Sequence, residues 1–300
     1  MRPTLPLATL LFVCAVVIAG CGQTKVRHVT TTITRSSSGA ATTPTVAGMT
    51  TAGSGGGGAA VAPHSHREHG SALAGRPGGA ILRAAAHALG HAGSYSMHAA
   101  LRQNGLRTVV NLAAVSAHRY VASTVVGRSS FELIVLSPRV YLQANRRFWL
   151  NQAGRSPTAR ARARRLAGRW LALPRRSGRS LTHSLGTLAP GTLARCLTED
   201  HGRLTVERRR RVVNHRRVII VRDAGNAPGA TPSTIAIAAD GAPYPLRYVA
   251  TGRTRPGGRV DVCNNGKGGG ATGTITLGRF GNTPSIQPPA DAQSGPSVAA

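Results

Sequence analysis

Five strand-like segments follow one another between residues 94 and 151, and only short turns separate them. Asn104-Gly105 is typical of a tight hairpin turn, and Ser137-Pro138 marks another short turn. Strands joined by tight turns lie antiparallel, whereas parallel neighbours need a crossover of roughly a dozen residues or more. The spacing therefore excludes a doubly wound α/β sheet and predicts an antiparallel meander.

Helical and strand-like blocks alternate around this meander. The spacing of Ile81, Ala85 and Leu89 predicts a helix before it, and Ser156-Pro157 opens a second predicted helix that ends near Ala167. A broken helical stretch follows at 180–197. After it come four more strand-like segments, at 203–223, 233–252, 259–265 and 272–280. This order predicts an α+β domain, a curved antiparallel half-barrel sheet covered by helices.

The chain begins with a short apolar segment, Leu10–Ala19, behind Arg2. A helix needs about 20 apolar residues to cross a bilayer, so this shorter run is typical of a signal peptide. Residues 18–21, Ile-Ala-Gly-Cys, resemble the bacterial lipobox. The resemblance implies removal of residues 1–20, acylation of Cys21, and an extracytoplasmic protein anchored to the cell membrane by lipid. The alternatives are an ordinary signal peptide or a single membrane anchor with an incidental cysteine.

Low-complexity sequence surrounds the predicted domain, which we place at residues 78–289. Residues 21–77 are mostly Thr, Ser, Gly and Ala, which cannot bury enough apolar surface to fold, so they predict a flexible tether. The histidines of His64–His69 match the spacing of no defined metal site, and we expect no metal or cofactor. The tail, 290–300, is also expected to be disordered.

Positive charge dominates the chain, which has 38 Lys and Arg against 9 Asp and Glu and a formal net charge of +29. Such a charge favours anionic partners: lipid head groups, acidic cell-wall polymers or nucleic acid. An exported protein meets the first two, so we expect no nucleic-acid partner, and we expect a monomer. Scattered arginines also arise from a biased codon usage, which is the alternative explanation.

Four cysteines are present, and two remain for the folded domain. Cys14 leaves with the signal peptide, and Cys21 is the predicted lipid acceptor. Outside the cytoplasm, Cys196 and Cys263 are expected to form a disulfide, which would stabilise the fold by about 3–4 kcal/mol. Two buried free thiols are the alternative.

Several segments in a fixed order resemble a known group of proteins. They are "SYSM", "FELIVLSPRVYLQANRRFW", "GRWLALP" and "IAIAADGAPYPLRYVATG". The order is similar to that of the actinobacterial LppX/LprG-type lipoproteins and the LolA and LolB lipoprotein carriers, over roughly residues 79–289. The side chains that fit the pattern are Tyr141, Trp149, Trp170, Pro243 and Pro245. The long tether and the many arginines depart from it.

This resemblance implies a half-open barrel that holds acyl chains of lipids or lipoproteins and carries them through the envelope. The residues expected to face the cavity are Leu133, Val135, Tyr141, Trp149, Leu166, Trp170, Ile235 and Ile237. At its rim, Arg146, Arg147 and Arg247 are expected to hold an anionic head group. A closed core and solvated arginines are the alternatives.

No sequence pattern predicts an enzyme. Only Glu199 and Asp200 are close together among the acidic residues, and neighbours on a strand point to opposite faces. The glycine-rich stretch 268–273 is followed by a strand-like segment where a dinucleotide site needs a helix. Two other functions stay open: a basic surface module that binds cell-wall polymer or phospholipid through 155–179 and 207–217, and a scaffold or sensor with a filled core.

Overall fold

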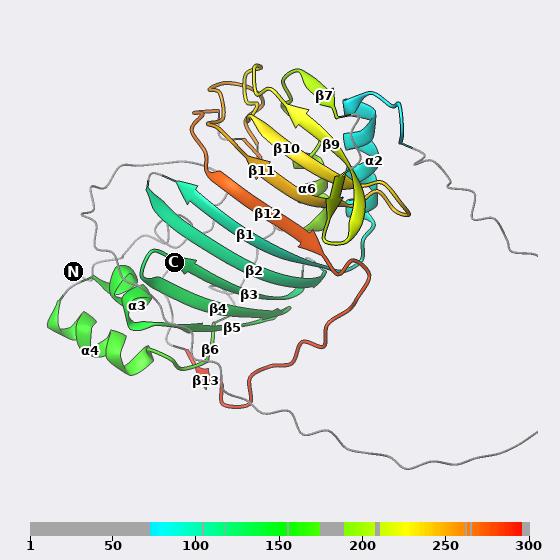
Figure 1. The fold of residues 1–300 in the computed structure, drawn as a ribbon. Helices are drawn as coiled ribbons and strands as arrows, with labels where there is room; N and C mark the ends of the chain where they lie inside the picture. The colour runs from blue at the N-terminus through cyan, green and yellow to red at the C-terminus, as the bar shows by residue number, and fades with distance from the viewer. Residues whose placement is uncertain are drawn as a thin grey trace, which may run out of the picture. The chain divides into compact units, whose positions relative to one another are not determined.

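The computed structural model describes residues 73–103, 105–116, 118–154, 156–174, 189–207, 211–261, 263–264 and 266–295. Within these residues the chain forms one large sheet, almost entirely antiparallel, that curves without closing, together with four helices (Figure 1). The predicted α+β fold with a curved, open sheet is therefore confirmed. The predicted signal peptide, Cys21 and His64–His69 lie outside the described residues.

The first five strands form a meander, as the turn spacing predicts. Each strand pairs antiparallel with the one before it. Burial alternates along most of their length, so that every second side chain faces the inner side of the sheet. The strands are β1 (Tyr95–Gln103), β2 (Leu106–Ser116), β3 (Arg119–Val126), β4 (Ser129–Leu136) and β5 (Arg139–Ala144).

The second block of strands completes the sheet from the other end of the domain. Its strands are β7 (Leu204–Val206), β8 (Arg211–Val213), β9 (Arg216–Asp223), β10 (Ser233–Ala238), β11 (Pro245–Ala250) and β12 (Thr272–Gly278). The last of these, β12, returns to pair antiparallel with β1, so that Leu277 lies opposite Met97. Gly273 in this seam has φ +138°, and an added Cβ would lie 2.2 Å from the Ala100 carbonyl oxygen, so the close pairing requires glycine.

A short parallel pair forms one end of the sheet. Strand β13 (Gln293–Ser294) pairs with β6 (Leu171–Ala172), and the Gln293 amide donates to the Trp170 carbonyl at 2.9 Å. The prediction of a disordered tail from residue 290 is therefore wrong at Gln293–Ser294. Composition missed this strand because its pairing uses backbone groups and no apolar side-chain pattern. Residues 296–300 lie outside the described residues.

Two helices cover the inner face of the second block. Helix α2 (Gly78–Gly90), where a helix was predicted, buries Ile81, Leu82 and Leu89. The first two pack against apolar side chains of β9 and β10. Helix α6 (Pro190–Cys196) packs beside α2 through Ala194 and Leu89. It is the described part of the predicted helical stretch 180–197; residues 175–188 are outside the description.

Two more helices follow the meander at the opposite end of the sheet (Figure 1). Helix α4 (Pro157–Leu166) begins as predicted, because the Ser156 hydroxyl accepts a hydrogen bond from the Ala159 amide at 3.1 Å. Helix α3 (Arg146–Ala153) corrects the expectation that strand structure continues to residue 151. There, the Asn145 side chain accepts from the Phe148 amide at 2.9 Å and caps a new helix.

The main core lies on the inner face of the meander. The register aligns one row of almost completely buried side chains across the sheet: Met97, Leu112, Ala122, Leu133 and Leu142. Phe148, Trp149 and Leu166 from α3 and α4 join the same cluster. Within the described residues, every helix is too short or too polar to cross a bilayer.

Candidate functional site

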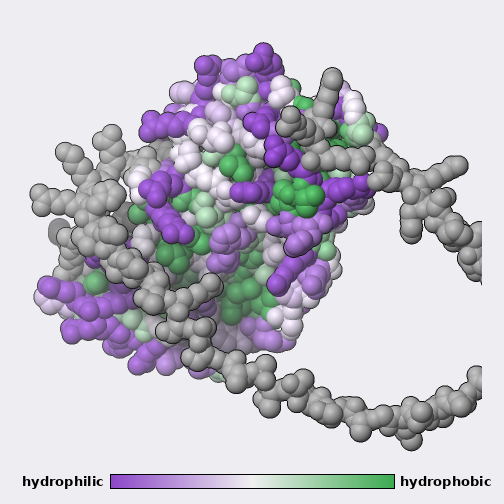
Figure 2. Space-filling view, in the orientation of Figure 1, coloured by the Kyte–Doolittle hydropathy of each residue, from purple (hydrophilic) through white to green (hydrophobic). Residues whose placement is uncertain are grey.

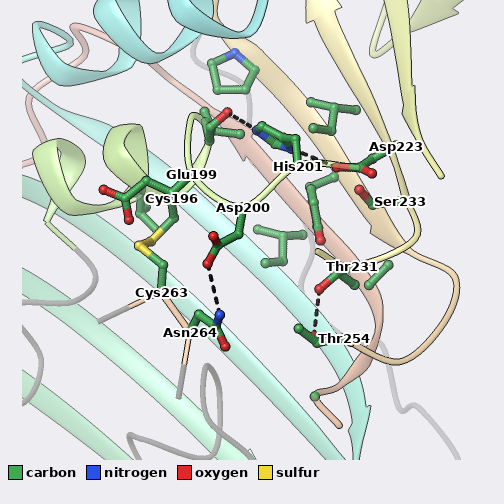
Figure 3. A pocket seen from close by; sticks show the side chains of 18 of the residues that line it. Cys196, Glu199, Asp200, His201, Asp223, Thr231, Ser233, Thr254, Cys263 and Asn264 are labelled. Atoms are coloured by element: carbon green, nitrogen blue, oxygen red, sulfur yellow. Dashed lines mark hydrogen bonds and ion pairs between the residues drawn. A yellow bond between two sulfur atoms is a disulfide. The ribbon is translucent and has the colours of Figure 1, made fainter. Parts of the chain in front are cut away.

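An apolar cavity of about 230 Å³ lies between helices α2 and α6 and the inner face of the second block, with β1 at its edge (Figure 3). Strand pairing places alternate side chains of β10, β11 and β12 on this face. The apolar side chains that line the cavity are Leu89, Leu101, Leu193, Leu197, Ile235, Pro245, Ala250, Ala271, Ile275 and Leu277. The cavity therefore offers hydrocarbon contacts on the helix side and on the sheet side.

Polar side chains gather at one part of the cavity wall (Figure 3). The Asn264 side-chain amide donates to an Asp200 carboxylate oxygen at 2.9 Å, and the hydroxyls of Thr231 and Thr254 lie 2.7 Å apart. These polar groups provide hydrogen-bond partners for one another, although they come from segments that are far apart in the chain. The wall thus combines an apolar surface with a hydrogen-bonded polar region.

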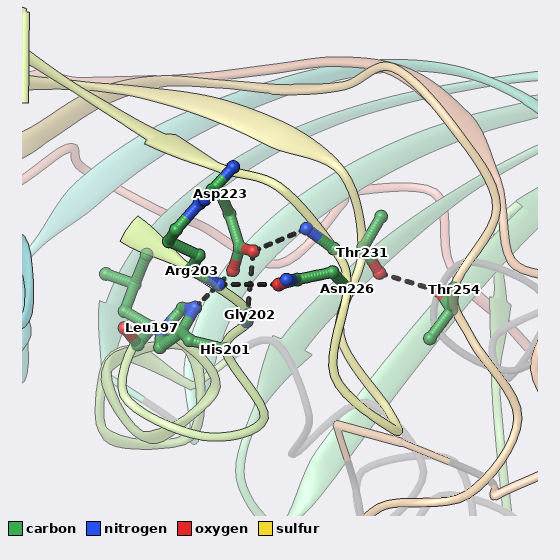
Figure 4. A network of polar contacts seen from close by, with 9 residues as sticks. Leu197, His201, Gly202, Arg203, Asp223, Asn226, Thr231 and Thr254 are labelled. Carbon is green, nitrogen blue, oxygen red and sulfur yellow. Dashed lines mark hydrogen bonds and ion pairs between the residues drawn. The ribbon is translucent and has the colours of Figure 1, made fainter. Parts of the chain in front are cut away.

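His201 and Asp223 form a largely buried ion pair beside this polar region (Figure 4). The His201 Nδ1 lies 2.7 Å from the Asp223 carboxylate, and its Nε2 lies 2.8 Å from the Leu197 carbonyl oxygen. Both ring nitrogens face acceptors, an arrangement that favours the protonated, cationic ring. Asp223 also accepts from the Gly202 and Gly225 amides, at 3.0 and 2.7 Å. The pair fastens the segment after α6 to β9.

Burial and hydrogen bonding shift the pKa values of His201 and Asp223 in opposite directions. Burial alone would lower the pKa of His201, but its hydrogen bonds to Asp223 and to the Leu197 carbonyl leave that pKa raised. Burial alone would raise the pKa of Asp223, but the hydrogen bonds from His201 and from the Gly225 amide leave it lowered. Each partner therefore holds the other in its charged form. With both nitrogens engaged, His201 offers no free base for proton abstraction.

The Cys196–Cys263 disulfide forms another part of the cavity wall (Figure 3). It joins the last residue of α6 to the loop between β11 and β12, with the two Cα atoms 5.3 Å apart, inside the range of ordinary disulfides. The C-terminal end of α6 is thus held over the sheet by the disulfide at Cys196 and by the hydrogen bond of His201 to Leu197.

Two carboxylates lie beside this disulfide. Glu199, Asp261 and Cys263 place possible ligand atoms within 4.8 Å of one another. However, the Cys263 sulfur is bonded to Cys196, so it is no thiolate ligand. A hydrogen bond between the two carboxyl groups raises the pKa of Glu199 and lowers that of Asp261. The cluster is best described as a pair of interacting carboxyl groups beside a disulfide.

The residues predicted to face a cavity are mostly elsewhere. Of the eight, Ile235 lines the cavity described above. Four lie in the main core on the inner side of the meander: Leu133, Val135, Trp149 and Leu166. Ile237 packs against α2, Tyr141 is buried on the outer face of β5, and Trp170 is half-buried before β6. The predicted residues are divided between the meander with its helices and strand β10, whereas this cavity lies over the second block.

The three arginines predicted to hold a head group also lie away from this cavity. Arg146 and Arg147 are exposed at the start of α3, and Arg247 is exposed on β11, on the face opposite the cavity. The charged groups in the cavity wall are Glu199, Asp200, His201 and Asp223. Sequence reasoning missed this polar region, although the link between Cys196 and Cys263 would have brought Glu199 and Asp200 near the β11–β12 loop.

Comparisons with known proteins give a structural likeness and no match in sequence. No family model matches the sequence, and no curated protein matches it. Among solved structures, the chain is similar to the crystal structure of LprF from Mycobacterium bovis, with a TM-score of 0.42 and 14% sequence identity. The likeness covers 71% of this chain and 97% of the LprF chain.

Proposed function

We propose that the domain binds the hydrocarbon part of a lipid in the cavity under α2 and α6. The observation that carries this proposal is the apolar lining, which comes from both helices and from four strands. A hydrocarbon chain that buried roughly 200 Å² of its surface there would gain about 5 kcal/mol from the hydrophobic effect, before the costs of association. The resemblance to acyl-chain carriers proposed from the sequence agrees with such a ligand.

The size of the cavity limits the ligand. Its volume of about 230 Å³ lies just below the range of roughly 300–1,000 Å³ that is usual for ligand pockets. The site therefore suits one short acyl chain, or the end of a longer one, and leaves a second chain outside. Binding of this kind needs no catalytic group, and we propose a binding protein or carrier with no enzymatic role.

Filling the cavity is expected to abolish lipid binding without loss of stability. Ala271 lines the cavity and is half-buried, so the ring of Ala271→Phe would occupy the space of the ligand. We expect at least tenfold weaker binding of a fluorescent fatty acid, a change of about 1.4 kcal/mol. The melting temperature should stay unchanged or rise, since the ring fills empty space.

The matched control for this experiment is Ala242→Phe, the same substitution at an exposed position of the β10–β11 turn. It should bind the probe like the wild type. Mass spectrometry of lipid extracted from purified wild-type and Ala271→Phe protein gives a second measurement. Equal lipid content in both, or a destabilisation of about 1–3 kcal/mol as in an overpacked core, would contradict the proposal.

We also propose that the protein is anchored outside the cytoplasm by acylation of Cys21. The lipobox-like residues Ile18–Cys21 support this proposal. The mature protein from the native host should begin at Cys21 and carry the added mass of its acyl groups, measured by intact mass spectrometry. Cys21→Ser should remain uncut and gain no acyl mass, and a wild-type protein that partitions into the aqueous phase of a detergent extraction would refute the anchor.

A further inference from the structure

The surface of α3 and α4 carries positive charge and no negative charge. Its exposed basic side chains are Arg146, Arg147, Arg160, Arg162, Arg164, Arg165 and Arg169. The sequence from residue 146 to 170 contains no Asp or Glu. Figure 2 shows hydrophilic surface over the part of the molecule where Figure 1 places these helices. We call this surface the α3–α4 face.

The fold of α4 turns its arginines outward. Ala159, Ala163 and Leu166 recur at helical spacing and are buried against the domain. Arg160, Arg162, Arg164 and Arg165 occupy the remaining sides of the helix and are exposed. Among the described residues, the ion pairs with carboxylates involve arginines of other elements, so no carboxylate neutralises these four.

A cluster of like charges on two packed helices repels itself unless an anionic partner covers it. Near an anionic bilayer, each such arginine strengthens binding about fivefold. The α3–α4 face thus carries the charge that suits an anionic membrane surface.

We infer that the α3–α4 face docks on a bilayer that contains anionic phospholipid. The proposed anchor at Cys21 would keep the domain close to that surface. A bilayer is therefore the polyanion that the face meets at the highest local concentration. The inference is independent of the cavity, which lies over the other block of the sheet.

Vesicle sedimentation tests this docking. The protein is the chain from residue 22 onward, so that neither the apolar signal segment nor an acyl anchor contributes. The vesicles are pure phosphatidylcholine or phosphatidylcholine with phosphatidylglycerol. We expect binding to the anionic vesicles that weakens as salt is raised, because salt screens exposed charges. Replacing Arg160, Arg162, Arg164 and Arg165 together by Gln should weaken this binding about a hundredfold or more.

The matched control removes the same charge elsewhere, by replacing Arg83, Arg107, Arg247 and Arg253, all exposed on other elements, by Gln. The fold-loss of affinity in this control should be less than a tenth of the fold-loss in the α4 variant. An equal loss in the two variants, or equal binding to neutral vesicles, would overturn the docking face. Retention on a soluble polyanion without vesicle binding would also overturn it and favour a cell-wall polymer. Circular dichroism should show both variants folded, since Gln is a good helix former.

Discussion

Replacing Cys196 and Cys263 together by serine should lower the free energy of unfolding by about 4 kcal/mol, because the bond closes a long loop in the unfolded chain. The two cysteines are 67 residues apart, and the bond fixes α6 to the β11–β12 loop. The effect is large beside the total stability of an ordinary domain, about 5–15 kcal/mol. Urea denaturation monitored by circular dichroism measures it.

Reduction provides the control for this substitution. Dithiothreitol should destabilise the wild type by nearly the same amount and should leave the double serine variant unchanged. Both proteins should begin at residue 22, so that neither Cys14 nor Cys21 competes for the pair. A wild-type protein whose unfolding curve does not respond to reductant would show that the disulfide contributes little to stability.

Asp223→Ala should cost about 3–5 kcal/mol, the usual result of leaving one partner of a buried ion pair alone. Asp223 is 5% exposed, and its loss removes the acceptor for His201 and for the Gly202 and Gly225 amides. Asp240→Ala is the matched control, because its pair with Arg217 is nearly half exposed and such pairs contribute about 1 kcal/mol at most. Equal losses of unfolding free energy in the two variants would show that the buried pair of Asp223 stabilises the fold no more than an exposed pair.

The same variant should change the dependence of stability on pH. The pKa of His201 is raised in the folded state, so its contribution is complete below its ordinary pKa of about 6.5 and is lost as pH rises through the raised value. The pKa of Asp223 is lowered, so its contribution is present above about pH 3.9 and is lost as pH falls through the lowered value. Wild type and variant should therefore differ most between about pH 4 and 6.5, and less above that range.

The elements set by local signals were predictable from the sequence. The hairpin turns gave the meander, apolar spacing gave α2, and Ser156-Pro157 gave the start of α4. Helix α3 was missed because the residues after β5 continue an apolar pattern, and the helix depends on one cap at Asn145. Strand β13 was missed because it pairs through its backbone.

The place of the cavity could not be predicted, because it depends on contacts between distant parts of the chain. Its wall brings Leu89 of α2 and Leu193 of α6 over Leu277 of β12. No local periodicity encodes that meeting, which follows from the pairing of β12 with β1. Apolar patterning identified inward-facing residues such as Leu133 correctly, but it does not distinguish a filled interior from a hollow one.

The seam between β1 and β12 has a consequence for biosynthesis. The strand that completes the middle of the sheet, Thr272–Gly278, is synthesised after the meander and after the other strands of the second block. Until it arrives, the nine-residue strand β1 presents a row of unpaired backbone groups, which is a template for other nascent chains. Premature termination before residue 272 would therefore produce aggregates of the meander, and timely completion of the C-terminal block protects the molecule from its own copies.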